Sequence, residues 1–206
     1  MYIPDAFQMD RTVDCHDLIR ENEFGTLTTV DSEGLPFATH LPFLIRPEEG
    51  TLGTLYAHMA RANPQWRHFA EGRQVLCVFQ GEHGYISPNW YTTRLYVPTW
   101  NYVAVHAYGV PEILAENEQI DDLMRNLSHP YEPQPGGWTF DSMAEKQREG
   151  LKKGIVAFRI PLVRLQGKAK LGQNKGTEQR LAAADGLAAT GDPTAIRLAN
   201  RMRQTE

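Results

Sequence analysis

The feature that most constrains the fold of this chain is a succession of short β-rich runs separated by turn residues. Alternation of apolar and polar side chains is the period of a pleated strand, and it recurs along the chain. Sequential strands joined by short turns pair as hairpins, so the sequence predicts an antiparallel barrel of about six strands rather than a parallel sheet. The runs are Thr26–Val30, Leu35–Ile45, Leu52–His58, Arg73–Gln80, Tyr85–Ser87 and Val97–Leu114, and strand character returns at Gly154–Leu165.

Helix signals interrupt these runs at several places. A helix is expected from near Thr12, another after Asn117, and one from Ser142, where Ser142 and Glu145 fit a capping box. Gly81–Gly84 is predicted to be a turn between two strands. Pro64–Glu71 is also expected to be helical, and Thr177–Ala189 and Pro193–Met202 are predicted to be two closing helices. The predicted class is therefore mainly β with flanking helices (α+β).

The bulk properties favour one generous domain in a reduced compartment. The chain has 206 residues, with 41% hydrophobic and 22% charged residues, as is ordinary for a globular protein. Its two cysteines form no CxxC pair and no zinc spacing, which favours the cytoplasm. The N-terminal residues do not resemble a signal peptide, and no window approaches the length of a membrane span.

Charge is distributed unevenly along the chain. The formal net charge is −4, but residues 161–206 hold eight Lys/Arg against four Asp/Glu, which is +4 and leaves −8 on the rest. The basic C-terminal segment is the place where contact with DNA or a regulatory protein partner is expected, although such an excess is more often a solvated helical face. The overall negative charge argues weakly against a protein that coats nucleic acid.

The stretch from Leu55 to Trp66 carries the clearest local chemistry. A strand ends near His58, and Asn63 followed by Pro64 marks the start of a helix. Arg61 therefore stands with an imidazole and an amide beside the positive end of a helix, an arrangement that suits a phosphate. The alternative interpretation is an ordinary strand–helix corner with a surface arginine.

Other kinds of site find little support in the sequence. Of the seven histidines, no two have the helical i,i+4 spacing with a glutamate between them. His40, His58 and His106 lie on predicted strands, where a half-buried hydrogen-bonded role is commoner than metal ligation. The sequence has no GxSxG motif, no GxGxxG motif and no Walker loop. We therefore expect no metal, and the catalytic residues stay unassigned, with His40 and His106 as the best candidates for a proton donor.

What remains is a flat or anionic small molecule at a barrel surface. Its contacts could come from four features: a strand edge with an imidazole, a phosphate-binding corner, an aromatic segment and a basic polar segment. For the aromatic residues the commoner fate is packing in a core or an interface. The candidate binding residues are Thr39, His40, Leu41, Pro42, His58, Arg61, Asn63, Trp100, Asn101, Tyr102, Lys168, Lys170, Gln173 and Asn174.

Five sequence blocks in this order resemble the PaiB family, which is described as FMN-binding negative transcriptional regulators. The blocks are GLPFATHLPF, AHMARANPQW, VFQGEHGYISPNWY, VPTWNYVAVHAYG and GKAKLGQN. The resemblance runs from the N-terminal MYIP to about Lys175. It implies a six-stranded antiparallel split β-barrel related to pyridoxamine-phosphate oxidases and flavin reductases, and a homodimer with FMN at the subunit interface. In the last block Ala169 and Gly172 stand where the family leads us to expect Trp and Ser.

The resemblance and the residues together predict residues 1–175 as an FMN-binding split-barrel domain with inserted helices, and 176–206 as a C-terminal helical extension. The residue-based and family-based interpretations meet at Arg61, because a phosphate prefers arginine and helix-terminal donors. Two functions stay open. One is a regulatory FMN-binding protein; the other is an enzyme, either a flavin-dependent oxidoreductase or a haem-handling split barrel.

Overall fold

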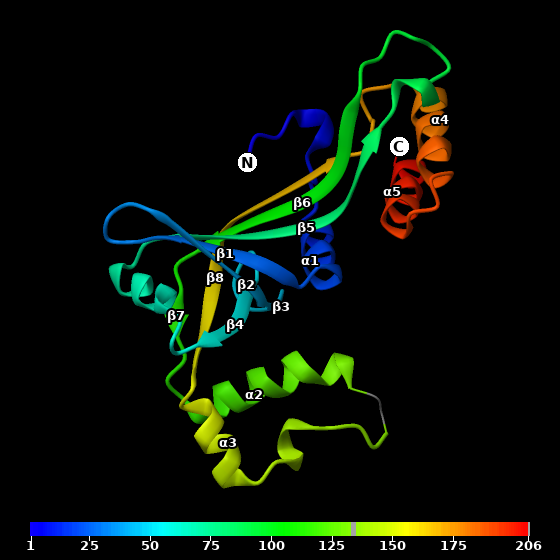
Figure 1. Ribbon diagram of the computed structural model, residues 1–206. Coiled ribbons are helices and arrows are strands. Elements are labelled where there is room, and N and C mark those ends of the chain that lie inside the picture. Colours follow the sequence, from blue (N-terminus) through cyan, green and yellow to red (C-terminus); the bar gives the residue numbers. More distant parts are fainter. Residues whose placement is uncertain (133–134, 206) are drawn as a thin grey trace. The chain divides into compact units, whose positions relative to one another are not determined.

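The alternating runs form an antiparallel sheet of eight strands in the computed structural model, which describes residues 1–132 and 135–205 (Figure 1). The order in the sheet is β2-β1-β5-β6-β8-β4-β3, and β7 pairs with β8. The strands are β1 (Phe24–Val30), β2 (Pro36–Pro42), β3 (Leu44–Arg46), β4 (Thr54–Ala60), β5 (Val75–Ile86), β6 (Thr99–Gly109), β7 (Glu112–Ile113) and β8 (Ile155–Lys170).

Among the described residues, five α-helices and several 3-10 segments accompany the sheet. The α-helices are α1 (Thr12–Glu21), α2 (Asn117–Ser128), α3 (Glu145–Lys152), α4 (Thr177–Ala188) and α5 (Pro193–Gln204). The 3-10 segments are η1 (Asp5–Phe7), η2 (Pro64–Glu71), η3 (Pro88–Trp90), η4 (His129–Tyr131) and η5 (Phe140–Ser142). The predicted α+β class is confirmed. In the described residues no helix combines the length and the apolar character needed to cross a membrane.

Several details of the prediction were wrong. The sheet has eight strands rather than about six, partly because the run at Leu35–Ile45 is two strands, with Phe43 between β2 and β3. The expected turn at Gly81–Gly84 lies inside the continuous strand β5. The predicted capping box is absent, since Thr139 caps η5 and α3 begins later, after Ala144 with no side-chain cap.

The described chain divides into two compact units. Unit 1 comprises residues 1–18, 80–105 and 166–206, and unit 2 comprises residues 19–79 and 106–165. Strands β5, β6 and β8 contribute residues to both. The domain boundary expected at residue 175 stays a prediction.

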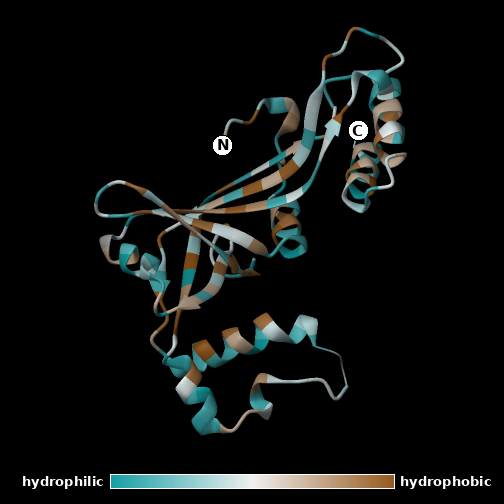
Figure 2. Ribbon diagram, viewed as in Figure 1, coloured by the Kyte–Doolittle hydropathy of each residue, from teal (hydrophilic) through white to brown (hydrophobic). Residues whose placement is uncertain are grey.

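In unit 2, one apolar side of α2 packs on the sheet. Leu123 of α2 is fully buried in a cluster with Tyr56 of β4 and Ala157 of β8. Ile120 and Met124 pack against the same cluster, and Figure 2 shows hydrophobic residues recurring along α2. Residues three and four apart lie on one helix face, so this spacing attaches α2 to the strands.

In unit 1, helices α4 and α5 pack against each other, and α4 also packs against η3. Trp90 of η3 lies on Gly186 of α4 so closely that a Cβ at position 186 would be 2.2 Å from the indole Cγ. Asp192 caps α5 by accepting a hydrogen bond from the Ala195 N–H at 2.8 Å. Both predicted closing helices are confirmed at nearly their predicted bounds.

Candidate functional site

The strand–helix corner in unit 2 is formed by the local signals that predict it. Asn63 is the N-cap of η2, and its Oδ1 accepts a hydrogen bond from the Gln65 N–H at 3.0 Å. Pro64 occupies the first turn, and Gly72 ends the helix in the left-handed region at φ 62°. The helix start is therefore confirmed. However, the Asn63 side chain accepts from the Gln65 N–H, so this donor at the positive end of the helix is not left for a ligand.

Gln65 anchors this corner, although no local pattern in the sequence indicates this role. Its side chain is fully buried, and Nε2 lies 3.0 Å from the Leu27 carbonyl and 3.1 Å from the Phe37 carbonyl. Nε2 also lies 3.2 Å from Thr29 Oγ1. The amide thus ties η2 to β1 and β2. A buried polar group needs such partners, but they lie about 28–38 residues away in sequence.

Arg61 is held at the surface beside the helix start. Its Nε donates to the Lys153 carbonyl at 2.8 Å and Nη2 donates to the Ile155 carbonyl at 2.6 Å. Its backbone N–H donates to the Gly154 carbonyl at 2.8 Å. Two of the five guanidinium N–H donors are therefore used and three stay available. The exposed cation is fixed in place by carbonyls that do not neutralise its charge.

The edge strand β2 is connected to this corner through one hydrogen bond. Asn63 Nδ2 donates to Thr39 Oγ1 at 3.0 Å. His40 is exposed, and its ring stacks on Phe24 with centroids 6.3 Å apart. Leu41 is buried and Pro42 is half-buried. Because β2 ends the sheet order, one side of it has no pairing strand among the described residues.

His58 lies on β4, opposite Ala157 of β8. Its Nδ1 is buried without a hydrogen-bond partner in the described structure. Burial lowers the pKa of His58, because the charged imidazolium is the form that loses solvation. His58 is therefore neutral at neutral pH and would assist a phosphate only as an N–H donor. Burial also lowers the pKa of His106, whose Nδ1 is likewise buried and unpartnered.

The remaining predicted residues lie in unit 1. Trp100 is 55% exposed and meets Tyr85 edge-on at 6.1 Å between centroids. Asn101 is buried, with Nδ2 3.5 Å from the sulfur of Met202. Tyr102 lies below the ammonium of Lys168, which is 5.2 Å from its ring centroid.

The basic segment of unit 1 is partly occupied by its own contacts. Lys168 is buried, and its ammonium donates to the Tyr2 carbonyl at 3.1 Å. Lys170 donates to Thr99 Oγ1 at 2.5 Å. Gln173 closes the turn that follows β8: Oε1 accepts from the Leu171 N–H at 2.8 Å, and Nε2 donates to the Ala169 carbonyl at 2.6 Å. Gln173 thus has a structural role. The other predicted amide of this segment, Asn174, is exposed, whereas Gln173 is half-buried.

The predicted residues therefore form two sets, one in each unit. In unit 2, Asn63 donates a hydrogen bond to Thr39, and Arg61 donates to the carbonyls of Lys153 and Ile155. Tyr102 and Lys168 are in contact in unit 1. A single site that includes both sets stays a prediction.

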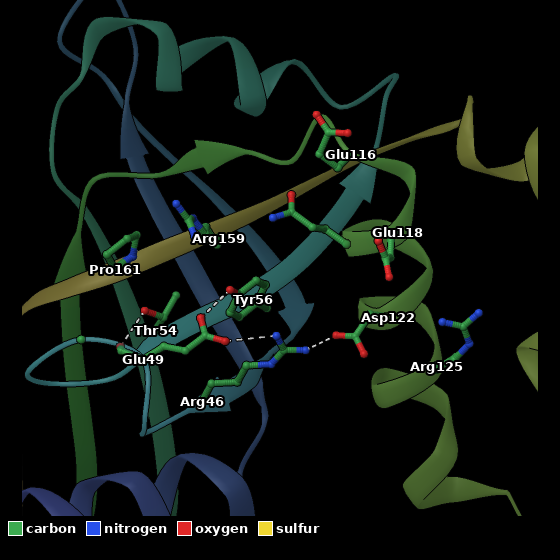
Figure 3. A pocket seen from close by; sticks show the side chains of 12 residues that line it. Arg46, Glu49, Thr54, Tyr56, Glu116, Glu118, Asp122, Arg125, Arg159 and Pro161 are labelled. Atoms are coloured by element: carbon green, nitrogen blue, oxygen red, sulfur yellow. Dashed lines mark hydrogen bonds and ion pairs between the residues drawn. The ribbon is translucent and has the colours of Figure 1, made fainter.

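Unit 2 also has a cavity of about 930 Å³ that includes none of the predicted residues (Figure 3). A charged network crosses it: Arg46 forms ion pairs with Glu49 and Asp122, and the Tyr56 hydroxyl donates to Glu49 at 2.5 Å. Figure 3 shows Arg46 reaching from the strands toward Asp122 on α2. Burial, and then the hydrogen bond to Glu49, raise the pKa of Tyr56. The network links α2 to β3 and β4 at the cavity.

Metal ligands do not gather in the described residues. No group of three or more His, Cys, Asp or Glu side chains there is arranged to hold a metal ion.

Residues 1–164 match the family described as "Putative FMN-binding domain". The chain is also 36% identical over 202 residues to "Protease synthase and sporulation protein PAI 2" of Bacillus subtilis, covering 98% of this chain and 96% of that protein. The chain belongs to this FMN-binding family. The resemblance to PaiB in the five sequence blocks is therefore confirmed.

Solved structures share the fold at low sequence identity. The flavocytochrome Anf3 of Azotobacter vinelandii superposes with a TM-score of 0.62 at 14% identity, covering 81% of this chain and 70% of that one. The FAD and heme binding protein of Mycobacterium smegmatis superposes with a TM-score of 0.59 at 19% identity, covering 85% and 79%. The split-barrel fold is thus confirmed, with eight strands in the sheet.

Proposed function

We propose that this chain is an FMN-binding regulatory protein that works as a homodimer, with the FMN phosphate held at the corner of unit 2. Membership of the FMN-binding family supports the cofactor. When bound, FMN would supply any redox chemistry, and the protein would supply position and electrostatics.

The observation that carries the proposal is the state of Arg61. Its guanidinium is fixed by two backbone carbonyls, exposed, and has three N–H donors left. A cation that is already held loses little side-chain entropy when it binds an anion. Asn63 and the neutral imidazole of His58 are the other polar residues that the sequence predicts as phosphate contacts at this corner. The residues thus fit a phosphate.

The flavin ring needs an apolar slot and backbone groups for its pyrimidine edge. The unpaired side of β2 at Thr39–Pro42 offers such groups, and Trp100 and Tyr102 offer aromatic faces. We propose that each of the fourteen candidate residues contributes to FMN binding, although Gln173 acts by shaping its turn.

Titration of the purified protein with FMN tests the proposal directly. We expect quenching of flavin fluorescence and a shifted visible absorption spectrum, saturating at one FMN per chain. An unchanged spectrum and undiminished fluorescence at saturating protein would contradict FMN binding.

The homodimer is supported by exposed aromatic side chains in unit 1, such as Trp100 and Tyr85, because aromatic residues are enriched at interfaces. Light scattering should give the mass of two chains at micromolar concentration. A monomer mass would refute the dimer and leave the FMN proposal to its own titration.

Regulation of transcription is proposed to proceed through the basic C-terminal segment or a protein partner. Arg201 of α5 forms an ion pair with Glu82, and Arg203 forms one with Asp185, so part of the segment's charge is already neutralised. This favours a protein partner over direct DNA contact. A gel shift at low salt distinguishes them, since DNA binding should appear there and weaken steeply with salt.

The two cysteines support a cytoplasmic location. Cys15 and Cys77 are both buried free thiols, as is usual in a reducing compartment.

A further inference from the structure

Arg180, in the first turn of α4, is a buried cation to which the described residues supply no counter-charge. The residue is 6% exposed, and its Nε has no hydrogen-bond partner among the described residues. The part of the chain that the structure describes also gives it no ion pair with a carboxylate. Buried charges are normally paired and hydrogen-bonded, because desolvation of an isolated charge is costly.

The position of Arg180 in its helix increases this cost. Its backbone N–H donates to the Gly176 carbonyl, so it lies at the N-terminal end of α4. The helix dipole puts partial positive charge at this end, where an anion is favoured and a cation is not. An arginine in this position is stabilised if an anion binds beside it.

Two lysines belong to the same segment of the chain as Arg180. Lys170 ends β8, and Lys175 lies in the turn before α4, with its ammonium 3.6 Å from the centroid of the Tyr96 ring. Burial lowers the pKa of Lys175, and the charge of Lys170 lowers it further, so the two ammonium groups repel each other. Residues 168–180 contain four cations and one acidic residue, the exposed Glu178.

The turn between the lysines brings backbone close to Arg180. Gly172 has φ 93°, a conformation that favours glycine. A Cβ at Gly172 would lie 3.5 Å from Arg180 Cγ and 3.9 Å from Asn101 Nδ2. The Lys175 N–H donates to the Gly172 carbonyl at 3.0 Å. The stem of Arg180 thus packs on the turn, which also lies beside the buried amide of Asn101.

We propose that Lys170, Lys175 and Arg180 form a binding site for a phosphate group in unit 1. This phosphate site is separate from the corner in unit 2, but it rests on the proposed function in one respect, since Lys170 is also one of the fourteen candidate FMN residues. The phosphate could belong to FMN or to a separate phosphorylated small molecule, and the experiment distinguishes these sources.

The first test is thermal unfolding with and without inorganic phosphate, at constant ionic strength. The wild-type protein should gain about 4–8 °C once phosphate exceeds its Kd about thirtyfold. Arg180→Met keeps the apolar stem and removes the charge. It should unfold at the same or a higher temperature without phosphate and lose most of the gain with it. Arg197→Met, an exposed residue of α5 that forms an ion pair with Glu82, is the matched control and should keep the full gain.

A structural role for Arg180 would give the opposite result in phosphate-free buffer, namely a marked loss of stability with the phosphate gain retained. If Arg180→Met does not fold, Lys175→Gln replaces it, and it should lose at least half of the gain in melting temperature. An unchanged phosphate gain in both variants would overturn the proposal, as would a wild-type protein that does not respond to phosphate.

The second test assigns the source of the phosphate by titrating FMN and riboflavin. If FMN affinity falls in Arg180→Met while riboflavin affinity does not, the phosphate of FMN binds here. If neither changes but inorganic phosphate binding is lost, the ligand is a separate phosphorylated molecule. The failure of the proposed function is distinct from both, since it would be the absence of flavin binding in the wild-type protein.

Discussion

Replacement of Arg61 by alanine isolates the contact with the FMN phosphate. The substitution removes the guanidinium and its three available N–H donors. A charge-assisted hydrogen bond contributes about 1.5–3 kcal/mol net. Because Arg61 is exposed, we expect the lower part of this range, about 1.5–2 kcal/mol, which is roughly a tenfold to thirtyfold loss of FMN affinity. Riboflavin lacks the phosphate, so its affinity should change little.

The structure also predicts the effect of this substitution on folding. Arg61→Ala loses two hydrogen bonds to the carbonyls of Lys153 and Ile155. These bonds are at the surface, and water can replace them, so the cost should be at most about 1 kcal/mol. In a chain of this size that lowers the melting temperature by roughly 2–4 °C. The variant should therefore fold and can be titrated.

Fluorescence quenching of both flavins by the wild-type protein and two variants completes the assay. Arg67→Ala is the matched control, because Arg67 is exposed on the same 3-10 helix η2. It should bind FMN like the wild-type protein. Equal losses of FMN and riboflavin affinity in Arg61→Ala would mean that Arg61 shapes the pocket. If neither affinity changes, the phosphate is held elsewhere, and Lys168, Lys170 and Lys175 become the candidates.

Three further predictions concern stability. Gln65→Leu should cost about 1–3 kcal/mol in urea unfolding, because it removes the buried donor shared by the Leu27 and Phe37 carbonyls; an unchanged midpoint would contradict its anchoring role. Gly186→Ala should lower the melting temperature despite the higher helix propensity of alanine, since the new Cβ would overlap Trp90. Gly150→Ala in α3 should raise the melting temperature, because no atom lies within 4 Å of the new Cβ. The pKa of His58 is lowered in the folded state, so the unfolded chain binds more protons and the free energy of unfolding should fall as the pH drops below about 6.5. The melting temperature of His58→Gln should depend less on pH over that range. An identical pH dependence in the two proteins would refute the argument.

Local signals predicted the elements that depend on neighbouring residues. Asn63 and Pro64 start η2 because capping acts over two or three residues. The bounds of α4 and α5 follow from Gly191, Asp192 and Pro193 in the same way. Capping and turn residues lie within a few residues of the helix end that they determine, so such ends can be predicted from the sequence alone.

Tertiary pairing decided the features that the sequence did not predict. Gly81–Gly84 has the composition of a turn, yet it stays extended within β5, which lies between β1 and β6 in the sheet. Because β1 pairs only with residues 76–78 of β5 in the described structure, pairing with β6 is the tertiary contact that can override this weak local preference. The role of Gln65 was missed for a similar reason, because its partners are on β1 and next to the start of β2 rather than near it in sequence.

The two arginines differ in a way that predicts how strongly each responds to an anion. Arg61 is exposed and already donates to two carbonyls, so water stabilises its charge when no ligand is bound. Arg180 is buried and has no partner in the described structure. Electrostatic attraction is stronger where water is excluded, so an anion that reaches Arg180 gains more than one that reaches Arg61. Salt should therefore weaken phosphate binding at Arg61 more than at Arg180, because exposed charges are screened and buried ones much less so.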